Sequence, residues 1–441
     1  MVVLRSPTNR RPWTVKSISR AVASLKRQVR PLHSLQVLDA GVVEEVFRQH
    51  GYAWRDRQLG PAQTLEYFVR QVIEGNVACS RVRHLAGGAF TASAYAQARS
   101  RLPVAAVWDV ARHATAQFSS VDAVRWRGHR TLLVDGTGFS MPDTPELQAA
   151  FGQPGKQKPG CGFPVAHLLV LFDAATGMVL EAYPGPLRTH DLKDLDHIHR
   201  HLQKGDILLG DEAFGSWGHI AALSGLEAHG IFPLHHCRPR VQGGNVDRIE
   251  RWPKPPRRPA WMGQEEFDRL PEAITVRLIR RRIRRRGRPG KVTVTLVTTL
   301  MDWEKYPAEE IVNLAGTRWE AETNLRHLKI TLRLDVLRCK TLAGVLRELA
   351  VVVLVYNLVR AVMLRAAGRQ GTTPGRVSFA DTLGWIRCAG ADGELYDLIV
   401  NPQRKGRLEP RVIKRRNEKY ARMTQPRMVL RKALETQGRA A

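Results

Sequence analysis

The sequence predicts an α/β protein in which a sheet-containing domain is interrupted by a β-rich insertion and preceded by a helical N-terminal domain. Three observations predict this class: helical periodicity from Ser17 to Arg101, short buried strands from Thr131 onward, and renewed helical periodicity over Ala308–Ala367. A chain of 441 residues has room for two or three domains. Its 43% apolar and 25% charged residues are an ordinary globular mixture, which excludes wholesale disorder.

The net charge predicts a polyanionic partner. Lys and Arg number 69 against 41 Asp and Glu, a formal charge of +28, and such a surface attracts nucleic acid. The first thirty residues are Arg-rich and acid-free, so we expect an arm that binds DNA together with the helices after it. The best apolar run, Val351–Leu358, is too short to span a bilayer, and no CxxC pair is present. A cytoplasmic protein without a membrane partner is expected.

Short apolar runs between Gly and Pro residues predict the sheet. Four strands are expected, at Thr131–Val134, Val165–Phe172, Met178–Tyr183 and Ile207–Gly210. Helices at Asp191–Gln203 and Trp217–Gly225 and a fifth strand at Gly230–Leu234 complete the pattern. Three strands followed by alternating helix and strand is the order of a ribonuclease-H-like domain, in which the first and fourth strands lie side by side.

A basic, β-rich insertion is predicted after the fifth strand. Ala273–Arg284 and Val292–Leu300 should form a hairpin around an arginine-dense turn at Arg285–Gly290. The expected domains are a helical DNA-binding region at 1–125, the two parts of the ribonuclease-H-like core at 126–235 and 310–400, the insertion at 236–309, and a basic C-terminal tail at 401–441.

Two aspartates end neighbouring predicted strands. Asp135 ends the first in LLVDGTG, and Asp211 ends the fourth in DILLGDEAFGSW. Each alone is an ordinary turn former. On adjacent strands their carboxylates would stand at one sheet edge and repel each other unless a cation shared the site. The sequence therefore predicts a site for Mg²⁺ or Mn²⁺.

A third metal ligand is expected from the helix LAGTRWEAETNLRHLKITL. Arg318, Glu322 and Lys329 are four and seven residues apart, which returns to one helical face and leaves Glu320 elsewhere. A carboxylate between two cations suits metal binding beside a phosphate clamp. A plain surface ion pair of Arg318 with Glu322 is the alternative, and the spacing alone does not separate the two.

These segments resemble the DDE transposases of bacterial insertion sequences, in the IS-four branch. The resemblance covers most of residues 90–370. It rests on the stretches Val134–Pro154 and Gly205–Trp217, on the Arg318 helix, and on Phe90–Pro103 and Leu354–Ala367.

The resemblance implies a cut-and-paste DNA transposase. It makes Asp135, Asp211 and Glu322 the catalytic ligands of two metal ions, and Arg318 and Lys329 the basic members of the family's Tyr-Arg-Glu-Lys signature. The position of the signature tyrosine holds Ala315, and Trp319 is the candidate substitute. The implied partners are double-stranded DNA, as terminal repeats and target, and a second copy of the chain on that DNA, in the bacterial cytoplasm at the nucleoid.

The insertion is expected to lie along DNA. Nine basic and no acidic residues occur from Arg277 to Lys291, and Arg281, Arg282 and Arg285 are the predicted phosphate contacts. A solvated hairpin is the alternative, but neighbouring like charges disfavour it.

Two other functions fit the same residues: a ribonuclease-H-like nuclease without strand transfer, and a derivative that only binds DNA. Zinc sites at His197 and His201, or at His235, His236 and Cys237, lack a further ligand for four-coordination, so structural or surface roles are expected there.

Overall fold

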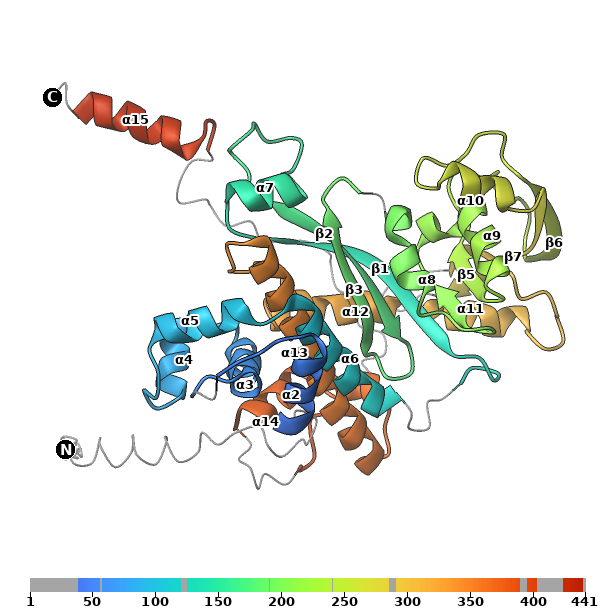
Figure 1. Cartoon of the computed structure of the whole chain (residues 1–441). Coiled ribbons are helices and arrows are strands. Elements are labelled where there is room, and N and C mark those ends of the chain that lie inside the picture. Colours follow the sequence, from blue (N-terminus) through green and yellow to red (C-terminus); the bar gives the residue numbers. More distant parts are fainter. Residues whose placement is uncertain are drawn as a thin grey trace, which may run out of the picture.

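The computed structural model describes residues 39–55, 58–119, 125–189, 191–239, 241–284, 291–388, 395–402 and 423–438. These residues form one twisted eight-stranded sheet with helices against it and a helical layer beside β1–β3 (Figure 1). The strands are β1 (Thr131–Ser140), β2 (Val165–Asp173), β3 (Val179–Pro186), β4 (Ile207–Leu209), β5 (His229–Pro233), β6 (Val246–Pro253), β7 (Ala273–Arg284) and β8 (Lys291–Thr298).

The first five strands have the predicted ribonuclease-H-like order. The sheet runs β3-β2-β1-β4-β5-β8-β7-β6. β1 pairs antiparallel with β2 and β2 with β3, whereas β1 pairs parallel with β4 and β4 with β5. The adjacency of the first and fourth strands, on which the predicted site depends, is thereby confirmed.

The β-rich insertion extends this same sheet. β5 pairs with β8, β8 with β7 and β7 with β6, each antiparallel, so the predicted hairpin is present as β7 and β8. Its turn, Arg285–Gly290, lies outside the described residues. β6 was not predicted, because its sequence is largely charged and only Trp252 is fully buried in it.

The sheet separates two hydrophobic cores because strand side chains alternate between its faces. Leu133 on β1 faces the larger core, together with residues of α11 (Ala308–Gly316), α12 (Trp319–Arg326) and α13 (Leu342–Arg369). Leu132 and Val134 face the smaller one, under α8 (Asp196–His199), α9 (Trp217–Gly225) and α10 (Gln264–Arg269).

The predicted N-terminal helices pack against α13, which comes late in the sequence. They are α2 (Ala40–Gln49), α3 (Pro61–Ile73), α4 (Cys79–Leu85), α5 (Ala92–Arg101) and α6 (Val104–Ser119). α3 and α6 contact α13, and all three contribute to the larger core. The N-terminal arm, residues 1–38, lies outside the described part of the chain.

α13 is longer than the apolar run that signalled it. Its 28 residues are long and apolar enough to cross a membrane by length and composition, but 78% of its most apolar window is buried inside the protein. Asn357 within the helix donates to Thr115 of α6 at 2.7 Å and accepts from the backbone of Val179 at 2.9 Å. Those are the surroundings of a core helix.

Smaller elements depart from the prediction. The helix expected at Asp191–Gln203 is a 3₁₀ turn, η2 (Asp191–Asp194), followed by the short α8. Of the predicted basic tail, residues 403–422 lie outside the described chain, while Arg427–Gly438 forms α15, which stands apart from the sheet in Figure 1. The remaining elements are α7 (Pro145–Phe151), η3 (Glu212–Gly215), η4 (His327–Thr331), η5 (Pro374–Arg376) and α14 (Phe379–Cys388).

Candidate catalytic site

Asp135 lies inside β1 and does not end it, contrary to the prediction. β1 continues to Ser140 because β2 remains paired with it, with Asp135 opposite Val170. β4 ends at Leu209, so β1 has lost that neighbour by the point where Asp135 stands. The carboxylate therefore lies where one side of a central strand becomes open.

Asp135 lies on the face of the sheet that α12 covers, and Asp211 follows the neighbouring strand. Leu133 and Leu209 are paired across β1 and β4, and both face the larger core. Asp135 follows Leu133 by two residues within β1 and therefore lies on the same face, while Asp211 lies two residues beyond the end of β4 as the N-cap of η3. On that face α12 contacts β1, and α12 carries Glu322.

The electrostatics of Asp135 indicate which charges lie near it. The pKa of Asp135 is raised to about 6, mainly because the carboxyl group is buried; Arg318 and the backbone N–H of Gly136 lower this pKa, and the carboxylates of Asp211 and Glu322 raise it. Asp135 is thus close to two other acids and one guanidinium. Arg318 is hydrogen-bonded to Glu322 and its charge also acts on Asp135.

Each acid has a fixed partner. The Gly136 N–H donates to Asp135 Oδ1 at 2.9 Å, and the Ala213 N–H donates to Asp211 Oδ1 at 2.9 Å. Arg318 Nη2 donates to Glu322 Oε1 at 3.3 Å, and the Glu322 side chain is 41% exposed. The surface ion pair that the spacing left open is therefore present, at the edge of the acidic cluster.

The donor set suits divalent cations with oxygen ligands. Carboxylate oxygens are what Mg²⁺ and Mn²⁺ prefer, and unrelieved repulsion around Asp135 is what such an ion would remove. The ligand oxygens of the three acids, all described, do not all lie within 4.8 Å of one another. An arrangement with two ions, which stand about 3.5 to 4 Å apart in such sites, tolerates that spread.

Lys329 does not follow the α-helical spacing used to predict it. α12 ends at Arg326, and Lys329 lies in the π-helical turn η4. A π turn widens the repeat, so Lys329 is rotated relative to Glu322. Ala315 packs at the edge of the larger core, and the side chain of Trp319 is 48% exposed.

The predicted DNA-contacting arginines differ in their surroundings. Arg282 is exposed, whereas the Arg281 side chain is 16% exposed and donates to Glu309 Oε1 at 2.8 Å. Arg277, within the same basic run, is 1% exposed and paired with Asp247 at 2.8 Å. Arg285 lies outside the described residues.

A pair behind β1 was missed by sequence reasoning. His167 Nε2 and Asp191 Oδ1 are 2.5 Å apart, and both lie against Gly136. A Cβ on Gly136 would stand 2.7 Å from Asp191 Oδ2, which is too close for any other residue. The two partners are 24 positions apart in the sequence, so no periodic pattern links them.

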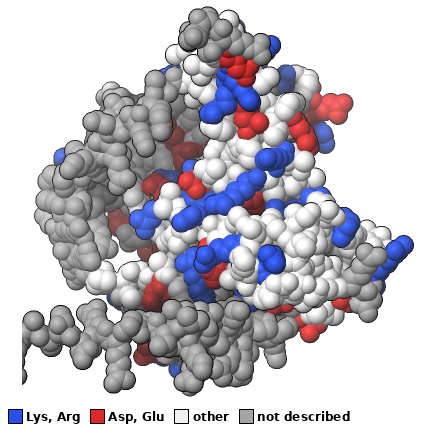
Figure 2. Space-filling view, turned by 90° about the vertical axis from the view of Figure 1, so that its left-hand side faces the viewer, with Lys and Arg blue, Asp and Glu red and all other residues white. Residues whose placement is uncertain are grey.

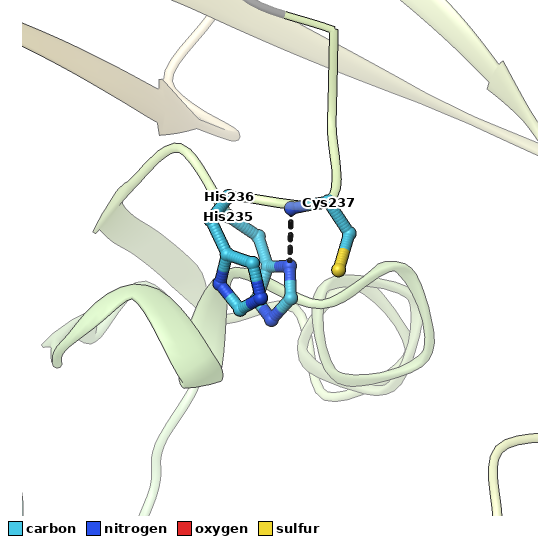
Figure 3. Close-up of side chains that lie close together, drawn as sticks. All are labelled: His235, His236 and Cys237. Carbon is cyan, nitrogen blue, oxygen red and sulfur yellow. Dashed lines mark hydrogen bonds between the residues drawn. The ribbon is translucent and has the colours of Figure 1, made fainter.

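The two histidine clusters behave differently. His197 stacks on Tyr183 with ring centroids 3.5 Å apart, while His201 Nε2 contacts Glu181 at 2.9 Å, so they have separate partners. His235, His236 and Cys237, by contrast, turn toward one another after β5 (Figure 3).

Basic side chains are prominent on the surface. Figure 2 shows Lys and Arg in a band across one face, with fewer Asp and Glu among them. Such a band matches the charge of a nucleic-acid backbone.

Comparison with known proteins gives three findings. The family model described as "Transposase DDE domain" matches residues 126–358. "Transposase InsG for insertion sequence element IS4" from Escherichia coli (strain K12) is 27% identical over 356 residues, covering 74% of this chain and 77% of that protein. The cryo-EM structure of the piggyBac transposase synaptic complex with hairpin DNA is similar at 9% identity with a TM-score of 0.46, over 81% of this chain and 79% of that chain.

Proposed function

Because this chain belongs to the transposase DDE domain family, we propose that Asp135, Asp211 and Glu322 are the acids for which the family is named. The chain is a DNA transposase, an enzyme that cleaves phosphodiester bonds and transfers strands. Its partner is DNA, and its family works with divalent metal ions. The observation that supports the assignment of residues is that the carboxylates of Asp211 and Glu322 both act on the charge of Asp135, where β1 has lost β4 as a neighbour.

The three acids would hold the metal ions. Asp135 and Asp211, both partly buried, and the more exposed Glu322 would together hold Mg²⁺ or Mn²⁺. The backbone N–H groups of Gly136 and Ala213 hold one oxygen of each aspartate, so the other oxygen can bind a cation. When bound, the ions would activate a water or a DNA 3′-hydroxyl and stabilise the leaving oxygen.

Basic residues would position the DNA around this centre. Arg318 holds Glu322 in place and presents its remaining N–H donors to a phosphate. Lys329 would add a second phosphate contact from η4, and Trp319, exposed beside Arg318, could stack on a base where the signature tyrosine is missing. Arg282 would contact DNA along the insertion. Arg281 would have to leave Glu309 to do so, and Arg285 is proposed from its sequence alone.

The larger assembly follows from the reaction. Joining two element ends requires both to be held at once, so we propose a homodimer on the terminal repeats, with the N-terminal region reading those repeats. The division into a helical region (1–125), a split core (126–235 and 310–400), an insertion (236–309) and a tail (401–441) belongs to this proposal. The site of action would be the bacterial cytoplasm, at the nucleoid.

The assignment is tested by separating binding from chemistry. Asp135→Asn and Asp211→Asn keep the side-chain shape but remove the charge. Each should reduce cleavage of a terminal-repeat duplex by more than about 100-fold, because replacing even a residue that only supports a metal ligand lowers activity by up to about 100-fold. DNA binding, measured by mobility shift, should persist. Asp143→Asn, an exposed aspartate, is the matched control. Cleavage at the wild-type rate by either variant would show that the replaced aspartate is not a catalytic residue.

A DNA-binding derivative without activity is the second candidate, favoured by Ala315 in place of the signature tyrosine. Joining and cleavage should therefore be assayed separately on the wild-type protein with Mg²⁺ and with Mn²⁺. Binding without either reaction would favour the derivative, and cleavage without joining would favour a nuclease.

A further inference from the structure

A second cluster of metal-binding side chains lies on the sheet edge that carries the aspartates. β1, β4 and β5 are consecutive parallel strands, and the chain leaving β5 continues directly into His235, His236 and Cys237 (Figure 3). We propose that these three residues, with Glu212, form a binding site for Zn²⁺ separate from the carboxylate centre.

The donor atoms are already gathered. One ligand atom from each of His235, His236 and Cys237 lies within 4.8 Å of the other two. In tetrahedral zinc sites, bonds of about 2.0 to 2.3 Å place ligand atoms roughly 3.3 to 3.6 Å apart. Side-chain rotation at exposed positions covers that difference, because His236 and Cys237 are exposed and no packed core resists them.

Glu212, which contacts His236 and whose side chain would have to turn toward the other two residues, is the fourth ligand of the proposed site. Its Oε1 lies 3.3 Å from His236 Nδ1. It comes from η3, 23 residues before His235, so no local motif joins the four residues. Two nitrogens, one sulfur and one oxygen make a complete tetrahedral set for zinc.

The two centres differ in chemical preference. The carboxylate centre offers only oxygen atoms, which suit Mg²⁺ and Mn²⁺. The second cluster offers imidazole and thiolate, which select zinc and its neighbours in the transition series. The Cys237 N–H now donates to His235 Nδ1 at 3.2 Å, so that nitrogen presents a lone pair toward Cys237, where a metal ion would replace the weak N–H contact.

Occupation of this site would fasten the loop that holds Asp211. Glu212 is the next residue in the chain, and η3 packs against β5. A zinc ion bound to both Glu212 and the residues after β5 would tie these segments together. The site would therefore stabilise the edge of the catalytic centre without taking part in its reaction.

Cobalt substitution of the full-length protein tests the site directly. Co²⁺ bound to a thiolate in a tetrahedral site gives charge-transfer absorption and strong visible bands, whereas oxygen-only sites absorb weakly. The wild type should bind one equivalent of Co²⁺ with the thiolate signature, and Zn²⁺ should displace it. Cys237→Ser should lose the signature, and Cys388→Ser, which removes another exposed thiol, should retain it.

Two further measurements separate this inference from the proposed function. The signature should persist in Asp135→Asn, which alters only the carboxylate centre. Zn²⁺ should raise the Tm of the wild type and of Cys388→Ser, but not that of Cys237→Ser or Glu212→Gln. Absence of the thiolate signature in the wild type, its persistence in Cys237→Ser, or an equal rise in Tm for all four proteins would overturn the proposal.

Discussion

Asp135 on β1 and Asp211 just beyond β4 each lie two residues after the last paired position of two parallel strands, Leu133 and Leu209. Paired residues of β1 and β4 differ by 76 in number, as Thr131 and Ile207 do, and the same difference separates the two aspartates. The pairing of β1 with β4 therefore brings the two segments that carry the aspartates side by side, and the cap of η3 then fixes Asp211. A site built in this way depends on the backbone near it as much as on its own side chains.

Glu322 should be essential, and its neighbour Glu320 should not. Glu322→Gln keeps the hydrogen bond to Arg318 possible but removes the charge that acts on Asp135. We expect cleavage of a terminal-repeat duplex to fall by more than about 100-fold, as for the aspartates. Glu320→Gln, on the same helix two residues earlier, should remain near the wild-type rate. Comparable losses in both variants would point to a general effect on α12.

The tight approach at Gly136 predicts a sharp contrast between two glycine substitutions. In Gly136→Ala the new Cβ would stand 2.7 Å from Asp191 Oδ2 and 3.0 Å from His167 Nε2, so the pair must move. We expect a lower Tm and lost cleavage, because the N–H of residue 136 also holds Asp135. In Gly316→Ala nothing lies within 4 Å of the new methyl group. This variant should keep the wild-type Tm or raise it, with a gain in the free energy of unfolding of up to about 1 kcal/mol. Equal melting temperatures of the two variants would show that His167 and Asp191 can move away from the new methyl group without loss of stability.

The two neighbouring arginines of β7 should differ in their effect on DNA binding. Arg282→Ala removes an exposed cation, so the slope of log Kd against log salt should fall by about one. Arg281→Ala removes a cation already paired with Glu309, so the slope should change less. Affinity measured by fluorescence anisotropy across a salt series decides this. A full unit of slope lost with Arg281→Ala would mean that Arg281 exchanges Glu309 for a phosphate.

A buried histidine should make the protein sensitive to acid. Burial lowers the pKa of His219 to about 3, while in the unfolded chain the ordinary value is near 6.5. Between these two pKa values, His219 is protonated in the unfolded state but neutral in the folded state. The free energy of unfolding should therefore decline as the pH falls from about 6.5 toward 3.

Replacement of this histidine tests the effect. Urea unfolding of His219→Gln between pH 7 and pH 5 should show a weaker decline in stability than the wild type shows. His84→Gln, which removes an exposed histidine, should keep the wild-type decline. An unchanged pH dependence in His219→Gln would assign the acid sensitivity to other groups.

The strands that build the site could be predicted because each is a short, fully apolar run. Leu132, Leu133 and Val134 are all buried, and so are the three residues of β4. The continuation of β1 could not be predicted, since Gly136 and Gly138 resemble a turn and only pairing with β2 keeps them extended. Whether the three acids and the arginines act as proposed is left to the experiments above.

Other features depended on partners that are distant in sequence. Arg277 belongs to a basic run that predicts exposure, yet Asp247 on the unpredicted β6 neutralises it in the interior. Lys329 was placed by α-helical spacing, which the π-helical turn interrupts. Glu212 and the residues after β5 meet only because β4 and β5 are adjacent.

The packing of α3 and α6 against α13 bears on how the protein is made. These helices end at Ser119, whereas α13 begins at Leu342. At about 5 to 20 residues per second, a ribosome needs roughly 10 to 45 seconds to translate the stretch between them. During that interval the apolar sides of the early helices lack their final neighbour. Synthesis of this protein therefore leaves a window of that length in which chaperones can engage the apolar sides of the early helices.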